Sequence, residues 1–177
     1  TGPPTPDVVE LARVTDRGIR ESKMLDMKQL VLEKDKSVIG VFCDNAVTDH
    51  DGNLFDVCSY ATTAALISCK LPKYEMQDDL PVKIENETID PPITTIPISV
   101  TMARIGDNIL VDPNMDEWSC LDARITITTN SDGNVVALQK GGPGGFTYDQ
   151  LIKCAEISIQ VGSKIREIMK EATKGSN

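Results

Sequence analysis

The sequence predicts an α+β fold, in which three long helices pack on a sheet of mixed and antiparallel strands. Residues 7–22, 55–69 and 147–173 each place apolar side chains at the spacing of one helix face. Short apolar runs between the second and third helix are joined by turns that contain Gly-Asp or Ser-Asp-Gly, which is typical of β-hairpins.

The composition sets limits on the class of protein. The chain has 177 residues, of which 40% are hydrophobic, enough for one domain with a real core. No apolar run approaches the roughly 20 residues of a membrane span, so no membrane role is expected. Residues 1–6 are linker-like, with no signal peptide. The net charge of −9 argues against nucleic-acid binding, unless one local basic stripe provides the contacts.

The five cysteines indicate a reducing compartment. Their number is odd and no Cys-x-x-Cys pair occurs among them, so neither a disulfide framework nor a zinc site is predicted. We expect them to be small core residues and the protein to be cytoplasmic.

The first helix, residues 7–22, has an apolar face and a basic stripe. The face consists of Val8, Leu11, Ala12, Thr15 and Ile19. Arg13, Arg17 and Arg20 recur at i, i+4 and i+7 and form one stripe opposite that face. Two interpretations stay open: a solvated face paired with neighbouring carboxylates, or a contact with a polyanion.

A strand–turn–helix junction follows. Residues 37–48 are apolar at most positions, which predicts a central strand, and the helix at 55–69 is rich in alanine. Such junctions often hold anions, because the helix N-terminus offers unpaired N–H groups. Here the junction carries Asp51 and Asp56 but no Arg or Lys, so its charge has the wrong sign for phosphate.

The remaining chain is predicted as an excursion, two hairpins and a helix. Residues 77–92 form an exposed excursion with a short possible strand at 82–84. The hairpins pair 97–105 with 108–111, and 124–129 with 134–139. Alternation along Ile125, Ile127, Val135 and Ala137 indicates a sheet with one buried face. Thr147 and Gln150 form a capping box for a helix whose inward residues are Leu151, Cys154, Ala155, Ser158, Val161, Ile165, Ile168 and Met169.

No catalytic or cofactor motif is complete. The acidic turn 49–53 starts like a calcium loop, but its Gly comes too early and Tyr60 stands where the closing Glu belongs. His50 is the only histidine and is expected to be a surface turn residue. The glycines at 141–145 lack the following Gly-Lys-Ser/Thr of a phosphate loop. No metal or cofactor is predicted.

Three segments, in this order and spacing, resemble one protein family. They are residues 10–22 (ELARVTDRGIRES), 49–56 (DHDGNLFD) and 110–113 (LVDP). Together they are similar to the RNase PH-like ring subunits of the exosome, and above all to the non-catalytic ring subunit of the archaeal complex. The resemblance implies an RNase PH fold, of the ribosomal protein S5 domain 2-like type. It also implies that residues 1–177 form a single RNase PH-like domain matching the C-terminal two-thirds of such a subunit, without its N-terminal unit.

The resemblance suggests why the turn at residues 49–56 carries carboxylates and no Arg or Lys. Active family members hold inorganic phosphate with Gly-Ser/Thr-Arg, and the matching positions here are Asn53, Leu54 and Phe55. Neither Leu nor Phe can hold a dianion. Active members also place an Asp general acid before an apolar-Pro pair, and we match that position to Thr95, which cannot serve as a carboxylic acid.

The resemblance therefore implies a non-catalytic subunit. It would pair with a catalytic RNase PH-like paralogue in a ring of three heterodimers, carry RNA-binding cap subunits, and act in 3′-to-5′ phosphorolytic RNA degradation. Arg13 and Arg17, and more weakly Arg20, would contact single-stranded RNA. The alternatives are an active phosphorolytic exoribonuclease with displaced catalytic residues, or a eukaryotic ring subunit, nuclear and cytoplasmic, that serves only assembly.

Overall fold

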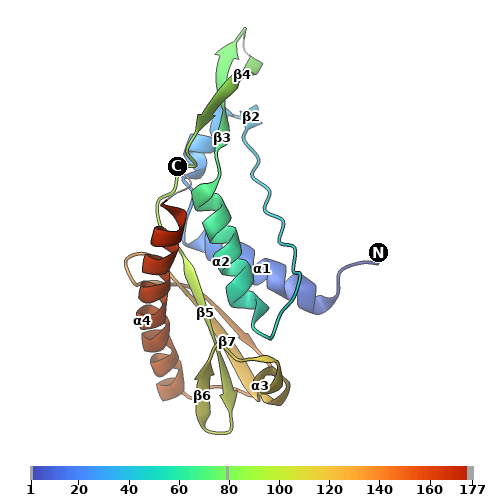
Figure 1. Ribbon diagram of the computed structural model, residues 1–177, viewed down its shortest axis with the longest axis vertical. Helices are drawn as coiled ribbons and strands as arrows, with labels where there is room; N and C mark the ends of the chain where they lie inside the picture. Colours follow the sequence, from blue (N-terminus) through green and yellow to red (C-terminus); the bar gives the residue numbers. More distant parts are fainter. Residues whose placement is uncertain (1, 79, 175–177) are drawn as a thin grey trace.

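A four-stranded antiparallel sheet in the order β6-β5-β7-β8 forms the centre of the structure. The computed structural model describes residues 2–78 and 80–174 (Figure 1). In chain order the elements are α1 (Pro6–Glu21), the 3-10 helix η1 (Met27–Leu30), β1 (Val31–Glu33), β2 (Ser37–Val38), α2 (Leu54–Ser68), β3 (Leu71–Gln77), β4 (Leu80–Ile89), β5 (Ile98–Ile105), β6 (Asn108–Val111), α3 (Met115–Cys120), β7 (Ala123–Thr129), β8 (Val135–Gly141) and α4 (Tyr148–Thr173).

The central sheet lies between two layers of helices. Helix α4 packs on β5 and β7, while α2 packs on β5 and α1 packs on α2 and β8 (Figure 1). This arrangement confirms the predicted α+β class, the three long helices and both hairpins. It also brings the N-terminal ends of α2 and α3 near the same end of the sheet.

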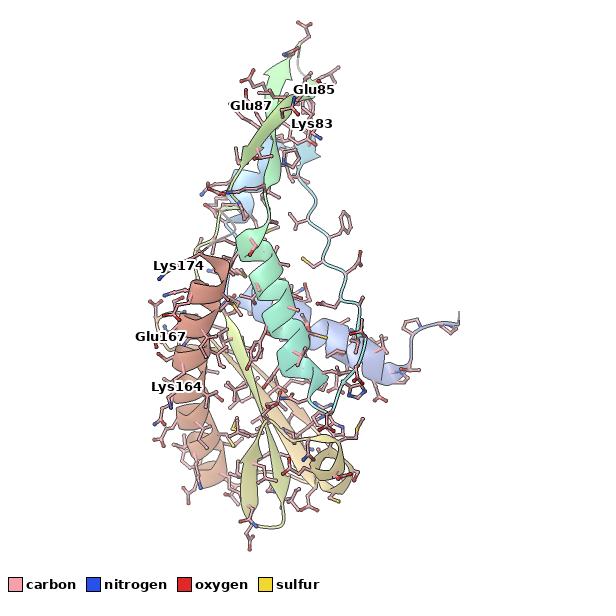
Figure 2. The ribbon with its side chains drawn as sticks, viewed as in Figure 1. Lys83, Glu85, Glu87, Lys164, Glu167 and Lys174 are labelled. Atoms are coloured by element: carbon pink, nitrogen blue, oxygen red, sulfur yellow. The ribbon has the colours of Figure 1, made fainter. Side chains whose placement is uncertain are left out.

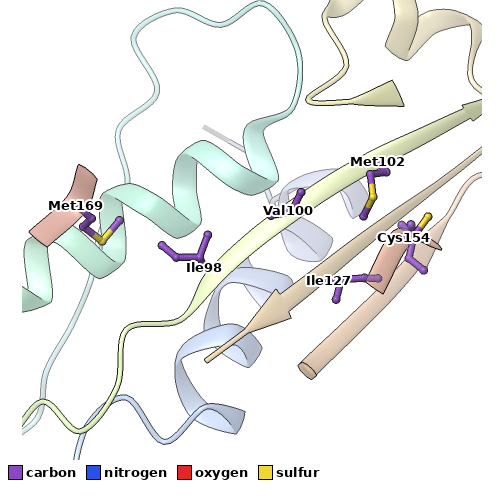
Figure 3. Packing of buried hydrophobic residues seen from close by; sticks show 7 residues of the cluster. Ile98, Val100, Met102, Ile127, Cys154 and Met169 are labelled. Carbon is purple, nitrogen blue, oxygen red and sulfur yellow. The ribbon is translucent and has the colours of Figure 1, made fainter. Parts of the chain in front are cut away.

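The two faces of the sheet have different chemistry. Toward α4, an apolar cluster is formed by Ile98, Val100, Met102, Ile125, Ile127, Cys154 and Met169 (Figure 3). Toward α2, the alternate residues are hydroxylic: Ser99 bonds Ser59 at 3.0 Å and Thr128 at 2.9 Å. Both faces of β5 and β7 are buried, so the prediction of one buried face is wrong for these strands. The cause is that Ser and Thr pair with one another and tolerate burial.

The register of β8 differs from the sequence-based pattern. Ala137 pairs with Thr128, and Leu138 pairs with Ile127. Ala137 therefore lies on the hydroxylic face, and not beside Ile125 and Ile127 as the alternation indicated, while Val135 pairs with Thr129. A register shift between Thr128 and Thr129 interrupts the regular alternation of side chains between the two faces of the sheet.

The inward face of α1 is rotated from the prediction, whereas that of α4 differs at one predicted position. In α1 the buried residues are Val14, Thr15 and Gly18, whereas Val8 is 53% exposed. Gly18 faces β7, where a Cβ would lie at an ordinary van der Waals distance of 3.5 Å from Thr128. In α4, Ile168 is exposed and Arg166 is buried, donating to the Thr129 carbonyl at 3.0 Å.

The predicted central strand at 37–48 is wrong. Only Ser37–Val38 is a strand, paired with β1, and residues 39–50 run as extended chain without a strand partner in the described part of the protein. Phe42 is 92% exposed. A strand needs hydrogen-bonded neighbours, and apolar composition alone does not supply them.

Strands β3 and β4 form a two-stranded ribbon that projects from the body (Figure 1). The segment 77–92, apart from residue 79, lies mostly within β4 and is largely exposed. Figure 2 shows Lys83, Glu85 and Glu87 on this ribbon, far from the central sheet.

The cysteines are only partly core residues. Cys58 and Cys154 are buried, as expected, and burial raises the pKa of both thiols. Cys43 and Cys120 are exposed, so the prediction is wrong for them. Cys43 belongs to the extended segment that has no strand neighbour, and Cys120 ends the short surface helix α3.

Candidate functional site

The turn before α2 is held tightly by the chain that precedes α3. Gly52 has φ +100°, and a Cβ at this position would lie 2.6 Å from the Pro113 carbonyl oxygen. Asn53 follows with φ 42° in the left-handed region and is 97% buried, with 3% of its surface exposed. These two backbone conformations explain why Gly and Asn occupy positions 52 and 53, since these residue types tolerate positive φ best.

The side chain of Asn53 joins two carboxylates. Its Nδ2 donates to Asp56 Oδ2 at 2.9 Å and to Asp112 Oδ1 at 2.7 Å. Asp56 also accepts from the Thr101 backbone N–H at 2.9 Å and from Thr101 Oγ1 at 2.7 Å. These bonds anchor the start of α2 to strand β5.

Asp56 is buried among neutral donors. Burial raises its pKa to about 6, the hydrogen bonds from Thr101 and Asn53 act in the opposite direction, and the nearby charge of Asp112 raises it further. Without a cation beside it, this carboxylate adds negative charge to the turn at neutral pH.

Phe55 packs in an aromatic stack beside the turn. Its ring is buried, stacked on Trp118 with centroids 6.0 Å apart and an interplanar angle of 22°. The Arg124 guanidinium lies 4.4 Å from the Phe55 centroid, and its Nη2 donates to Glu10 Oε2 at 2.6 Å. The Arg124 guanidinium is thus neutralised by Glu10 and covered by the rings of Phe55 and Trp118.

A cavity of about 390 Å³ lies beside this stack, between α1, the turn and α3. Leu54 contributes to its wall, as do Val8, Met115 and Leu121. Leu54 therefore presents an apolar surface where the matching family residue carries a hydroxyl.

Thr95 is not brought to the turn. It lies before β5, where its Oγ1 accepts from the Ser131 N–H at 3.0 Å and bonds Ser131 Oγ at 3.0 Å. Thr101, which contacts Asp56, lies six residues further along the strand, roughly 20 Å at about 3.3 Å per residue. The structure thus separates the two predicted positions of the degenerate site.

The three arginines of α1 differ in their surroundings. Arg20 pairs with Asp16 at 3.3 Å and Glu21 at 3.4 Å. Arg17 is half-buried, and its Nη1 donates to Gln139 Oε1 on β8 at 3.1 Å, a neutral partner that leaves the charge uncompensated. Arg13 is exposed and has no hydrogen bond or ion pair within residues 2–78 and 80–174.

Several residues of the site were not found from the sequence. Gln139 links Arg17 to Glu10, accepting from the first and donating to Glu10 Oε1 at 3.1 Å. Trp118 and Arg124 lie more than sixty residues from Phe55 in the chain. Of the residues in this site, only Asp112 belonged to a segment that carried the family resemblance, residues 110–113. The resemblance did not assign a role to its side chain.

Metal and membrane features are limited in the described residues. No group of three or more His, Cys, Asp or Glu side chains is placed to hold a metal ion there. Within the same residues, every helix is too short or too polar to cross a bilayer.

The chain matches models of the 3′ exoribonuclease family in two places. Domain 1 of that family matches residues 1–72 and domain 2 matches residues 95–161. The ribbon β3–β4 lies almost entirely between them.

Similar full-length proteins are exosome components of archaea. The chain is 42% identical over 172 residues to exosome complex component Rrp42 of Thermococcus gammatolerans, covering 97% of this chain and 63% of the relative. It is 43% identical over 176 residues to the Pyrococcus horikoshii protein of the same name, covering 99% and 64%. The chain therefore spans less than two-thirds of the length of these relatives.

Solved structures give the same picture. A chain of the Archaeoglobus fulgidus exosome, with RNA bound to the active site, superposes with a TM-score of 0.80 at 37% identity, covering 96% of this chain and 64% of that one. An archaeal exosome core gives 0.78 at 35% identity, covering 95% and 66%. Rice Rrp46, at 14% identity and a TM-score of 0.63, shares the fold.

Proposed function

Because the chain belongs to the 3′ exoribonuclease family of RNase PH-like proteins, we propose that it is a non-catalytic subunit of an exosome ring. In this proposal it supplies structure and RNA contacts, while a catalytic paralogue performs 3′-to-5′ phosphorolysis.

The turn before α2 is the observation that carries the proposal. At the positions matched to Gly-Ser/Thr-Arg, Leu54 lines an apolar cavity and Phe55 is buried in a stack. The nearest guanidinium, Arg124, is already paired with Glu10. Asp56 and Asp112 add negative charge beside Asn53, so a phosphate dianion at the turn would be repelled by these carboxylates.

Phosphate-dependent release of nucleoside diphosphates from single-stranded RNA tests this proposal. We expect no release by the chain alone above a protein-free control, and release when a catalytic paralogue is added. Release by the chain alone, dependent on inorganic phosphate, would contradict the proposal and identify an active exoribonuclease with displaced catalytic residues.

We further propose that Arg13 and Arg17 contact RNA phosphates. Arg13 is exposed without a partner in the described chain, and Arg17 has only the neutral Gln139. Arg20 contributes less, because Asp16 and Glu21 already share its charge. A ring subunit that serves only assembly would not need these unpaired charges.

The proposed partners follow from the relatives. The similar structures are an exosome with RNA bound and an exosome core, which supports a complex with other subunits and RNA. In our proposal the complex is a ring of three heterodimers, each with a catalytic RNase PH-like subunit, and it carries RNA-binding caps, as the family resemblance implies. We place this complex in the cytoplasm, since the five cysteines are unpaired, as is usual in a reducing compartment.

We also propose that the chain is one RNase PH-like domain whose N-terminal unit lies outside it. A groove of about 880 Å³ runs between residues 37–46, α2 and the ribbon, lined by Ala61, Ala65, Leu66 and Tyr74 among others. The neighbouring segment 39–50 is extended without a strand partner in the described residues. The relatives are longer by more than a third of their length, which is enough chain to fill the groove and pair with this segment.

A further inference from the structure

We propose that the cavity between α1, the turn before α2 and α3 is a docking site for a protein segment that carries an apolar anchor residue flanked by Lys or Arg. This inference does not depend on the proposed exosome function, because it rests on the apolar walls and the charges of the cavity alone.

The walls of the cavity suit an apolar side chain. Val8 of α1 and Met115 of α3 are 53% and 43% exposed, although both border a cavity of about 390 Å³. Leu11, Leu54 and Leu121 continue this surface. A volume of this size lies within the usual range for ligand pockets, and it matches one or two large side chains.

Two buried polar atoms at the cavity lack partners. Asn53 Oδ1 and Arg124 Nη1 have no hydrogen bond in the described structure, and both residues line the cavity while being 97% and 92% buried (3% and 8% exposed). Asn53 Nδ2 faces Asp56 and Asp112, so its oxygen points away from them. Both atoms are enclosed by protein, with almost no surface open to solvent, so they leave unpaired polar groups in the wall but do not select the occupant, which the apolar walls and the charges determine.

The charge around the cavity selects a cationic segment. Asp7 lies in its wall, and Asp51 and Asp116 lie beside the lining residues Gly52 and Met115. All three are exposed, and none makes an ion pair within residues 2–78 and 80–174. Lys or Arg residues on either side of the anchor would meet these carboxylates, whereas the phosphates of a nucleic acid would be repelled.

Trp118 reports directly on this cavity. It is the only tryptophan of the chain, it lines the cavity, and it stacks on Phe55. Its fluorescence therefore reads the cavity without a label. The probe is a blocked hexapeptide, Lys-Lys-Leu-Phe-Arg-Lys, titrated into the 177-residue chain.

Three other probes separate the possible ligands. One peptide replaces every Lys and Arg by Glu, a second replaces Leu and Phe by Ser, and the third probe is oligoadenylate. We expect a saturable change in Trp118 emission with the first peptide near roughly 0.1 mM, and binding at least about ten-fold weaker with the others.

Charge reversal at the mouth supplies a matched variant. Asp51→Lys with Asp116→Lys should weaken the cationic peptide about ten-fold and leave the circular dichroism spectrum unchanged, since both residues are exposed. The control reverses Asp107 on the β5–β6 turn and Glu167 on the outer face of α4 (Figure 2) and should bind like the wild type.

Three outcomes of these titrations would overturn the proposal. These outcomes are no change in emission up to about 1 mM peptide, equal binding of the Glu-substituted peptide, or equal weakening by the control variant. A change caused by oligoadenylate alone would instead make the cavity a nucleic-acid site.

Discussion

Asp56 is an acidic residue whose side chain is buried, although burial disfavours its charged form. Within the described residues its carboxylate accepts hydrogen bonds from Asn53 and Thr101 and makes no ion pair, and burial raises its pKa to about 6. Ordinary carboxyl groups in unfolded chains titrate near 3.8. The folded protein therefore binds a proton on Asp56 more readily than the unfolded chain does.

The first prediction concerns the pH dependence that follows from this difference. Between about pH 6 and pH 4, the native state binds more protons at Asp56 than the unfolded state, so this residue makes folding more favourable as the pH falls. The wild type should gain up to about 3 kcal/mol of unfolding free energy, relative to Asp56→Asn, between pH 7 and pH 4. Urea unfolding of both proteins across this range measures the difference.

Asparagine is a conservative replacement at this position. Its oxygen can accept from the Thr101 N–H, and its amide can donate to Thr101 Oγ1, which already bonds Thr126 Oγ1 at 2.8 Å. Asp107→Asn, on an exposed turn, is the control and should follow the wild type. An unfolding free energy difference that stays constant from pH 7 to pH 4 would show that the Asp56 pKa is not raised.

At the scale of elements, α1 presents one face to α2 and β8 and another to solvent. Gly18 fits against Thr128, and Arg17 reaches across to Gln139. The helix thereby holds Arg17 in place while Arg13, one turn earlier, stays free. This geometry makes the two arginines suitable for phosphate contact without a cost to the core.

The second prediction concerns RNA binding by this helix. In the assembled ring, Arg13→Ala with Arg17→Ala should weaken single-stranded RNA and make the salt dependence shallower, by about 0.7 in log–log slope for each lost contact. Sequence preference should not change, because phosphate contacts carry none. The measurement is RNA affinity across a salt series.

Two control variants accompany this measurement. Arg20→Ala should have a smaller effect, because Arg20 is ion-paired. Lys164→Ala with Lys174→Ala removes the same charge from α4, where Figure 2 shows both side chains on the outer surface, and should bind nearly normally. If the α4 pair weakens RNA as much as the α1 pair, the effect reflects net charge and not a site on α1.

At the scale of the whole molecule, the groove beside residues 37–46 is the least complete region. Its wall is mainly apolar, and Phe42 stands almost fully in solvent. Apolar grooves of this kind are usually covered in the functional protein. The extended segment beside it has backbone groups that a neighbouring strand would satisfy.

The third prediction concerns hydrogen exchange in this region. In the 177-residue chain, amides of residues 39–50 should exchange quickly, since they lack strand partners among the described residues, except Ile39, whose N–H donates to the Leu30 carbonyl at 2.8 Å. The amides of β5 and β7 should be well protected. In a chain extended at its N-terminus to the length of the relatives, exchange at 39–50 should slow about a hundred-fold or more. Mass spectrometry of peptic peptides resolves the two segments.

The exchange of β7 serves as the internal control for this comparison. Protection of β7 should be similar in both chains, because it already has β5 and β8 as neighbours. Strong protection of residues 39–50 in the shorter chain would show that a partner strand is present within it. Unchanged fast exchange in the longer chain would rule out the proposed pairing.

The sequence by itself determined the three long helices, both hairpins and the residue types at the turn before α2. Periodicity and turn residues are local signals, so the helices and both hairpins were predicted with boundaries close to those observed. The comparison of Asn53-Leu54-Phe55 with Gly-Ser/Thr-Arg also needs only neighbouring residues. For the same reason, the sequence alone showed that the turn carries negative charge, which does not suit phosphate.

Only the tertiary structure decided which distant residues meet. Arg124 and Trp118 stack with Phe55, Gln139 holds Arg17, and Asp112 shares Asn53 with Asp56, through contacts that no local pattern encodes. Strand pairing is likewise non-local: residues 37–48 have strand composition, but a strand forms only where another chain segment supplies the hydrogen bonds. The separation of Thr95 from the turn has the same origin, since the direction and length of β5 set that distance and the spacing of residues does not.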